Sequence, residues 1–119
     1  MNSARIILSL VPDLFFASKI NTAAAHLGVA IHATTPERLA ADARAQRPDL
    51  IIIDLHASGG VLDAVRELKR DPALASTRVI GFYSHVEAQM RVAALEAGVD
   101  EPLPRSAFTL KLAALLAGN

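Results

Sequence analysis

Short apolar runs alternate with longer amphipathic segments along the whole chain. Four runs rich in branched or aromatic residues predict strands, and a weaker run with two prolines predicts a fifth, at residues 4–10, 29–33, 50–53, 78–83 and 101–103. The segments that separate them predict helices from their apolar spacing, at residues 13–27, 34–46, 61–69, 87–97 and 107–117. A regular alternation of strand and helix is typical of α/β folds with a parallel sheet.

The ends of the predicted helices carry residues that favour starting or stopping a helix. Asp13 is placed to cap the first helix, and Gly28 follows it, where a left-handed residue is favoured. The second helix is expected to begin at Thr34 or Thr35, whose hydroxyl would cap it, with Pro36 in the first turn. It should end two residues before the next proline, because the residue before a proline is pushed out of the helical region.

Two features set the order of the strands. Residues 50–53 are apolar without alternation, which predicts a strand covered on both faces and therefore central in a parallel sheet. Pro102 and Pro104 lack the N–H that a sheet ladder needs, so the fifth strand should lie at an edge. The sequence thus predicts one domain over residues 1–119, a flavodoxin-like (βα)5 doubly wound sandwich whose five-stranded parallel sheet has helices on both faces.

Composition narrows the range of functions. The chain of 119 residues contains no Cys, which excludes thiol catalysis, disulfides and Cys-based zinc sites. Its 12 Lys and Arg balance 12 Asp and Glu, so the basic excess typical of nucleic-acid binders is missing. The apolar runs are far too short to span a bilayer, and the N-terminus does not have the pattern of a secretory signal. We therefore expect a cytoplasmic domain with neither nucleic acid nor membrane as a partner.

Binding sites in a doubly wound sheet form at the carboxyl ends of the strands. The predicted strands end in polar and charged residues at this edge: Asp13, His32, Asp54, His56, Tyr83, Ser84, His85, Arg105 and Ser106. Their spacings match neither a nucleophile–base pair nor a helical metal site. We expect no catalytic residue, no metal and no cofactor among them.

The chain resembles, over essentially its whole length, the receiver domains of bacterial two-component response regulators, and three stretches carry the resemblance. They are Pro-Asp-Leu-Ile-Ile-Ile-Asp-Leu at residues 48–55, the strand and serine at residues 78–84, and residues 97–108. The resemblance implies that Asp54 matches the aspartate that receivers phosphorylate. It also implies that Arg105 stands where receivers carry a lysine.

The hydroxyl residue that ends the fourth strand of receivers has two candidates in this chain. Counting forward from Asp54 favours Ser84, whereas counting back from Gly98 favours Tyr83. We favour Ser84, and either hydroxyl could donate a hydrogen bond to an anion on Asp54.

The end of the first strand departs from the receiver pattern. Receivers carry two adjacent acids there, which hold a magnesium ion together with the phosphorylated aspartate. This chain has Leu10 and Val11 instead, so a magnesium ion would lose most of its oxygen ligands. Asp13 is near in sequence, but we expect it to cap the first helix.

The loop after the fifth strand also departs from the receiver pattern. Receivers have a Lys-Pro pair, typically joined by a cis peptide, where this chain has Arg105 and Ser106. We expect a trans peptide here, because a cis bond before a residue other than proline costs about 3 to 4 kcal/mol. An ion pair between Arg105 and Asp54 is expected to occupy the phosphoryl site. The switch aromatic of receivers is missing as well, since Pro102 aligns with it.

These departures predict a stand-alone pseudo-receiver, a non-enzymatic signalling and protein-interaction module that is not phosphorylated by a magnesium-dependent mechanism. The alternative is a phosphorylatable single-domain response regulator with Asp54 as the phosphoacceptor. The expected partner is a protein, either a signalling kinase or an effector. Asp13, His56 and His85 are expected at the rim of the site.

His32, His56 and His85 each follow a predicted strand. They could gather as a cluster that binds a transition metal or senses pH, although a polar rim is the simpler interpretation. Residues 54–59 also fit the Asp-x-His-x-x-Gly pattern of cobalamin-binding domains, but the later elements of that motif are missing. We therefore do not expect cobalamin.

The helices offer two candidate contact surfaces. Phe15 and Phe16 begin the first helix, where neighbours lie about 100° apart, so we expect one to face the core and the other to contact a partner, unless both pack beneath loops. The fifth helix has an apolar stripe, with Leu110 and Leu112, that is broader than one face requires. This breadth supports the hypothesis of a homodimer.

Overall fold

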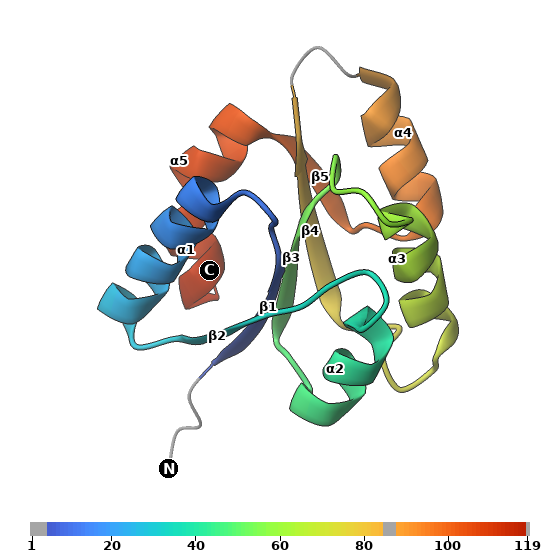
Figure 1. The fold of residues 1–119 in the computed structure, drawn as a ribbon, viewed down its shortest axis with the longest axis horizontal. Coiled ribbons are helices and arrows are strands. Elements are labelled where there is room, and N and C mark those ends of the chain that lie inside the picture. The colour runs from blue at the N-terminus through green and yellow to red at the C-terminus, as the bar shows by residue number, and fades with distance from the viewer. Residues whose placement is uncertain (1–4, 85–87, 119) are drawn as a thin grey trace.

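Strands and helices alternate along residues 5–84 and 88–118, the part of the chain that this computed structural model describes. Their order is β1 (Ile6–Leu10), α1 (Leu14–Leu27), β2 (Ala30–Ala33), α2 (Leu39–Gln46), β3 (Leu50–Asp54), α3 (Val61–Arg70), β4 (Arg78–Tyr83), α4 (Ala88–Ala97), β5 (Glu101–Pro104) and α5 (Arg105–Ala117). The alternation that the sequence predicts is confirmed, and Figure 1 traces it from the N-terminus to the C-terminus.

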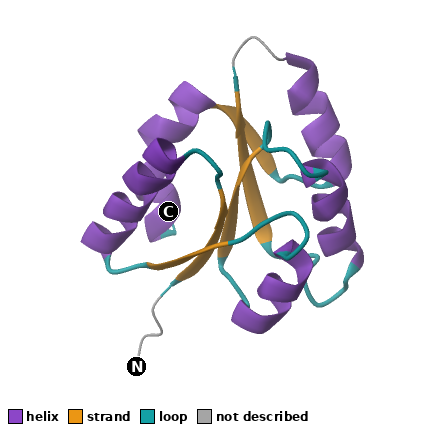
Figure 2. Cartoon of the chain, viewed as in Figure 1, coloured by secondary structure: helices purple, strands orange, loops and turns teal. Residues whose placement is uncertain are grey.

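The strands form one parallel sheet with the order β2-β1-β3-β4-β5. Helices α1 and α5 lie on one side of the sheet, and α2, α3 and α4 lie on the other (Figures 1 and 2). This is the predicted flavodoxin-like doubly wound sandwich. β3 is central and buried along its whole length, and the proline-containing β5 is at an edge, both as predicted.

Alternation along the strands gives the sheet two separate apolar cores. Ile51 and Ile53 pack on the side of α2, α3 and α4, whereas Leu50 and Ile52 pack on the side of α1 and α5. The same alternation near the end of β4 sends Phe82 to the α1 and α5 side, and Tyr83 to the other. Because β3 contributes to both cores, it needs the unbroken apolar run seen in the sequence.

The start of α2 differs from the prediction. The helix begins at Leu39, after a turn that is closed by a hydrogen bond from the Arg38 N–H to the Thr35 carbonyl (3.1 Å). The predicted hydroxyl cap is wrong, because the helix starts well after Thr34 and Thr35, and its N-cap residue, Arg38, makes no side-chain capping bond. The Thr34 hydroxyl donates a hydrogen bond to Oδ2 of Asp42 (2.7 Å).

The start of α5 also differs. The helix begins at Arg105, two residues before the prediction, with the extended Pro104 as its N-cap residue. The chain passes directly from β5 into the helix, with no loop between them. The peptide between Arg105 and Ser106 is trans, as predicted. Among the described helices, none is long and apolar enough to cross a bilayer.

Candidate functional site

Asp54 is the last residue of β3, and its side chain is largely buried. Its Oδ1 accepts a hydrogen bond from the backbone N–H of His56 (2.9 Å), and its carbonyl accepts one from the N–H of Ala57 (3.0 Å). These two bonds close a tight turn at the carboxyl end of the strand. The predicted phosphoacceptor position is therefore a carboxylate that is fixed by its own turn.

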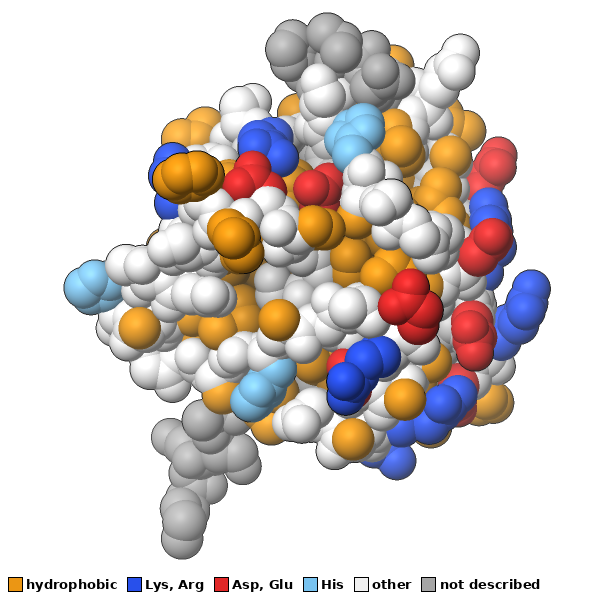
Figure 3. Space-filling view, in the orientation of Figure 1, with side chains coloured by type: hydrophobic (Ala, Val, Ile, Leu, Met, Phe, Trp, Pro, Cys, Tyr) orange, Lys and Arg blue, Asp and Glu red, His pale blue; other side chains and the backbone are white. Residues whose placement is uncertain are grey.

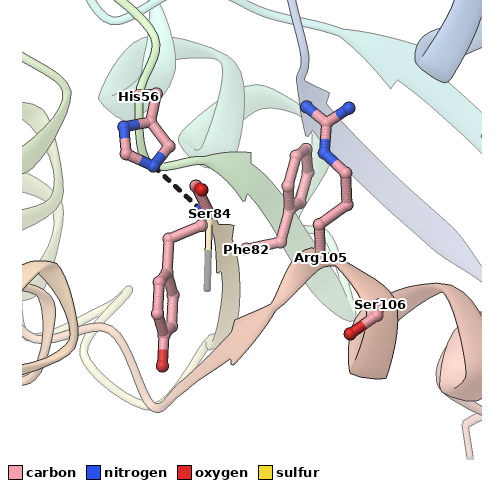
Figure 4. A pocket seen from close by; sticks show the side chains of 6 residues that line it. His56, Phe82, Ser84, Arg105 and Ser106 are labelled. Carbon is pink, nitrogen blue, oxygen red and sulfur yellow. Dashed lines mark hydrogen bonds between the residues drawn. The ribbon is translucent and has the colours of Figure 1, made fainter. Parts of the chain in front are cut away.

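His56 joins this turn to the end of β4. Its Nε2 accepts a hydrogen bond from the backbone N–H of Ser84 (3.0 Å), which is drawn as the dashed line in Figure 4. A ring nitrogen that accepts a hydrogen bond carries no proton, so the proton of the neutral imidazole is on Nδ1. His56 is exposed, and it holds the backbone of Ser84 in place.

The two candidate hydroxyl residues have different surroundings. Tyr83 is almost fully buried in the core on the α2, α3 and α4 side, and Ser84 is exposed just beyond the strand. Both line the same hollow. The backbone of Ser84 is held by His56 while its hydroxyl lies at the rim, an arrangement that favours Ser84 over Tyr83 as a contact for a bound group.

Arg105 does not pair with Asp54. Within the described residues, the ion pairs join other side chains, so the expected Arg105–Asp54 pair is wrong. The guanidinium carbon of Arg105 lies instead 4.6 Å from the ring centroid of Phe16 and 5.3 Å from that of Phe82. Aromatic faces attract a guanidinium electrostatically and by stacking, so they hold it without a carboxylate.

Three phenylalanine rings form the support beneath Arg105. Phe16 of α1 meets Phe82 of β4 edge-on at 4.9 Å between centroids, and Phe82 stacks on Phe108 of α5 at 4.9 Å. All three are buried, whereas Phe15 is 88% exposed. The prediction that one of the two neighbouring phenylalanines faces the core is confirmed. The role of the rings beneath Arg105 was missed, because sequence spacing does not show that three distant elements meet.

The end of β1 carries apolar side chains. Leu10 is buried and pairs with Ile53 of β3, and Val11 packs against the α1 and α5 core. The Asp13 Oδ1 accepts hydrogen bonds from the N–H groups of Phe15 (2.9 Å) and Phe16 (3.4 Å), so Asp13 caps α1 as predicted.

The side chains at the ends of β1 and β3 do not fit a magnesium ion. That ion requires a near-octahedral set of oxygen ligands, and Leu10 and Val11 provide no side-chain oxygen at the end of the strand next to Asp54. No group of three or more His, Asp or Glu residues is close enough together to hold a metal in the parts of the chain described, 5–84 and 88–118.

His32 and His56 do not form the histidine cluster that was the weaker alternative to a polar rim. His32 lies in the edge strand β2, opposite Leu8 of β1, and it does not line the hollow beside His56. His85 and the start of the predicted fourth helix lie outside the described residues. His56 is therefore the histidine that the structure places at the site.

A hollow of about 290 Å³ opens between the ends of β4 and β5. It is lined by His56, Phe82, Tyr83, Ser84, Arg105 and Ser106. In Figure 4, His56 and Arg105 stand on opposite sides, with Phe82 and Ser84 between them. Acidic, basic and histidine side chains gather at this end of the molecule (Figure 3). The site predicted at the carboxyl ends of the strands is thus a hollow with both apolar and polar walls.

Solved structures share the fold of this chain. The chemotaxis protein CheY4 of Vibrio cholerae superposes with a TM-score of 0.80 at 13% identity, covering 96% of this chain and 99% of the other. The chain has the receiver-domain fold. The receiver domain of sensor histidine kinase PA1611 from Pseudomonas aeruginosa, solved with a magnesium ion in its active-site cleft, has a TM-score of 0.78 at 19% identity, covering 98% of this chain and 100% of the other.

A further neighbour of this receiver fold is the phosphorylated cyanobacterial phytochrome response regulator RcpA. It has a TM-score of 0.78 and 19% identity, covering 98% of this chain and 91% of the other. The sequence itself matches no family model and no curated protein. The likeness to receivers is therefore one of fold, and the chemistry has to be argued from the side chains at the strand ends.

Proposed function

We propose that this receiver-fold chain is a pseudo-receiver, a signalling module that works by binding a protein partner and does not carry a phosphoryl group on Asp54. The observation that carries the proposal is the apolar end of β1. Leu10 is buried beside β3, and Val11 packs into the core. The charge that gathers on a phosphoryl group during transfer would have no magnesium ion held there to balance it.

The position of Arg105 supports the same proposal. In the mechanism that the receiver resemblance implies, a cation near the aspartate contacts the transferred phosphoryl group. Here the cation rests on Phe16 and Phe82 and forms no ion pair with Asp54 in the described structure. Moving it to a phosphate on Asp54 would break two cation–π contacts, worth about 0.5 to 1 kcal/mol each at an exposed site.

The proposed partner surface is the start of α1. Leu14 and Phe15 are 82% and 88% exposed, next to the Phe16 that supports Arg105. Exposed aromatic side chains are enriched at protein interfaces, and this chain has few of them. A signalling kinase or an effector protein that offers an apolar groove to this surface would fit it.

A homodimer stays part of the proposal. Leu110 is 88% exposed on the outer face of α5, which packs beside α1. Sedimentation at high protein concentration tests it. Dimers that revert to the 12.6 kDa monomer on Leu110→Ser would support self-association, and monomers at every concentration would exclude it.

The alternative function is a phosphorylatable single-domain response regulator. Asp54 at the end of β3, with the Ser84 backbone fixed nearby through His56, favours it. Titration with magnesium ions, followed through the backbone amide signals of residues 54–57, separates the two functions. The pseudo-receiver predicts no saturable shift at millimolar magnesium. A saturable shift that Asp54→Asn removes would support the regulator.

A further inference from the structure

The hollow between β4 and β5 combines a cationic side chain, Arg105, with an apolar wall, Phe82, and the proposed partner surface on α1 uses neither. We propose that the hollow reversibly binds a small organic carboxylate, with Arg105 recognising the charge and Phe82 forming an apolar wall. Its volume of about 290 Å³ is near the lower end of the range for ligand pockets, which suits a ligand of a few carbon atoms. Ligand binding would give the proposed module a means of control other than phosphate.

Arg105 is positioned to receive a carboxylate. A guanidinium has five N–H donors in a planar fork, and the contacts of Arg105 with the rings of Phe16 and Phe82 supply it with no oxygen acceptor. Within the described structure, no acidic side chain pairs with it. The edge of the fork can therefore take both oxygens of a carboxylate.

The other polar groups of the hollow are suited to an anion. Ser84 and Ser106, which carry hydroxyl groups, are among the residues that line it, and none of the six lining residues that the structure describes is acidic. Ser106 belongs to the first turn of α5, a helix of 13 residues that begins without a side-chain cap. Backbone N–H groups in such a turn add to the attraction for negative charge.

Asp54 and the apolar wall both affect how an anion binds in the hollow. Asp54 lies next to Phe82 in the sheet register, so its negative charge is close to the hollow although it does not line it. This charge opposes the attraction of Arg105 for an anion, and both interactions grow with the charge of the anion. The apolar wall adds a contact that inorganic phosphate cannot use, and this contact favours an organic carboxylate.

The inference rests on the proposed function in one respect, since the hollow is free for a ligand only while Asp54 stays unmodified. Removing the Asp54 charge should help a bound carboxylate, whereas it would abolish a covalent phosphoryl group. The variant Asp54→Asn thus gives opposite results for the two kinds of occupant. Failure of the ligand proposal can in this way be told apart from failure of the pseudo-receiver proposal.

The test is a titration with benzoate, followed by the amide signals of Ser84 and Ser106 and the Nε–H signal of Arg105. Benzamide, a neutral molecule of the same shape, is the ligand control, and inorganic phosphate is the second anion. We expect saturable shifts with benzoate, none with benzamide and weaker binding of phosphate. Equal responses to benzoate and benzamide, no saturation, or tighter binding of phosphate would overturn the proposal.

Variants locate the binding group. Arg105→Gln should weaken benzoate binding about tenfold or more. Arg105→Lys keeps the charge but not the planar fork, so its affinity for benzoate should lie between those of Arg105→Gln and the parent. Lys111→Gln removes a cation of the same helix that pairs with Glu101 outside the hollow, and it should change nothing. Asp54→Asn should tighten binding about two- to fivefold. An unchanged affinity in Arg105→Gln, or a loss in Asp54→Asn, would contradict the assignment.

Discussion

The backbone N–H of Ser84 donates a hydrogen bond to Nε2 of His56, 28 residues earlier in the chain. Since Asp54 in turn accepts the N–H of His56, the ends of β3 and β4 are joined through one imidazole. This link fixes one wall of the hollow that Arg105 faces.

Replacing His56 by Ala should release Ser84. The loss of one hydrogen bond of this kind costs about 0.5 to 1.5 kcal/mol of unfolding free energy, and the Ser84 amide should exchange with solvent faster. Hydrogen exchange and urea denaturation measure the two effects. His32→Ala, at an exposed position in β2, is the matched control, and equal effects of the two substitutions would argue against the link.

Gly81 lets Leu55 pack against β4. A Cβ at position 81 would lie 2.8 Å from the side chain of Leu55, closer than real contacts allow. We expect Gly81→Ala to lower the unfolding free energy by about 1 to 3 kcal/mol through overpacking. In a Leu55→Ala background the same substitution should cost clearly less, and an additive double variant would disprove the clash as the cause.

Two substitutions of Asp13 test whether its side chain stabilises the fold by capping α1. Asp13→Ala should cost about 1 kcal/mol of unfolding free energy, because the N–H groups of Phe15 and Phe16 lose their acceptor. Asp13→Ser keeps a capping oxygen and removes the charge, so its unfolding free energy should be close to that of the parent. If Ser destabilised as much as Ala in thermal melts, the carboxylate charge rather than the cap would matter.

Asp71 makes stability depend on pH in acid. A hydrogen bond from the Arg44 side chain, followed by one from the Ala73 N–H, holds the pKa of Asp71 below its ordinary value of 3.8. The unfolded chain therefore binds a proton at higher pH than the folded chain does. The stabilisation is complete above about pH 4 and is lost as the pH falls through the lower, folded pKa.

Arg44→Gln should reduce the dependence of the unfolding free energy on pH in acid. Denaturation at a series of pH values between about 2 and 5 should give a flatter curve of unfolding free energy than the parent shows. Asp71→Asn should flatten it in the same way, and the double variant should flatten it no further. A parent-like slope in Arg44→Gln would show that the pair does not cause the shift.

The sequence predicted the sheet better than the site. The unbroken apolar run of β3 and the prolines of β5 determine where these strands lie, because burial and the missing N–H act locally. The predicted starts of α2 and α5 were wrong by a few residues, since a turn closed by the Arg38 N–H and the Thr35 carbonyl precedes α2, and α5 follows Pro104 directly.

The error over Arg105 has a different origin. Opposite charges at two strand ends suggested an ion pair with Asp54, but the partners are two rings, from α1 and β4, against which Phe108 of α5 packs. Only the packed fold brings those rings together beneath the guanidinium. The absence of acids at Leu10 and Val11, in contrast, could be read directly from the sequence.

The central claim is that Asp54 does not become phosphorylated, and intact mass tests it directly. The chain is incubated with acetyl phosphate and magnesium ions beside its Asp54→Asn variant and a receiver of known activity. We predict an unchanged mass for the parent chain under conditions that modify the active receiver. A gain of one phosphoryl group in the parent that is lost in Asp54→Asn would contradict the account.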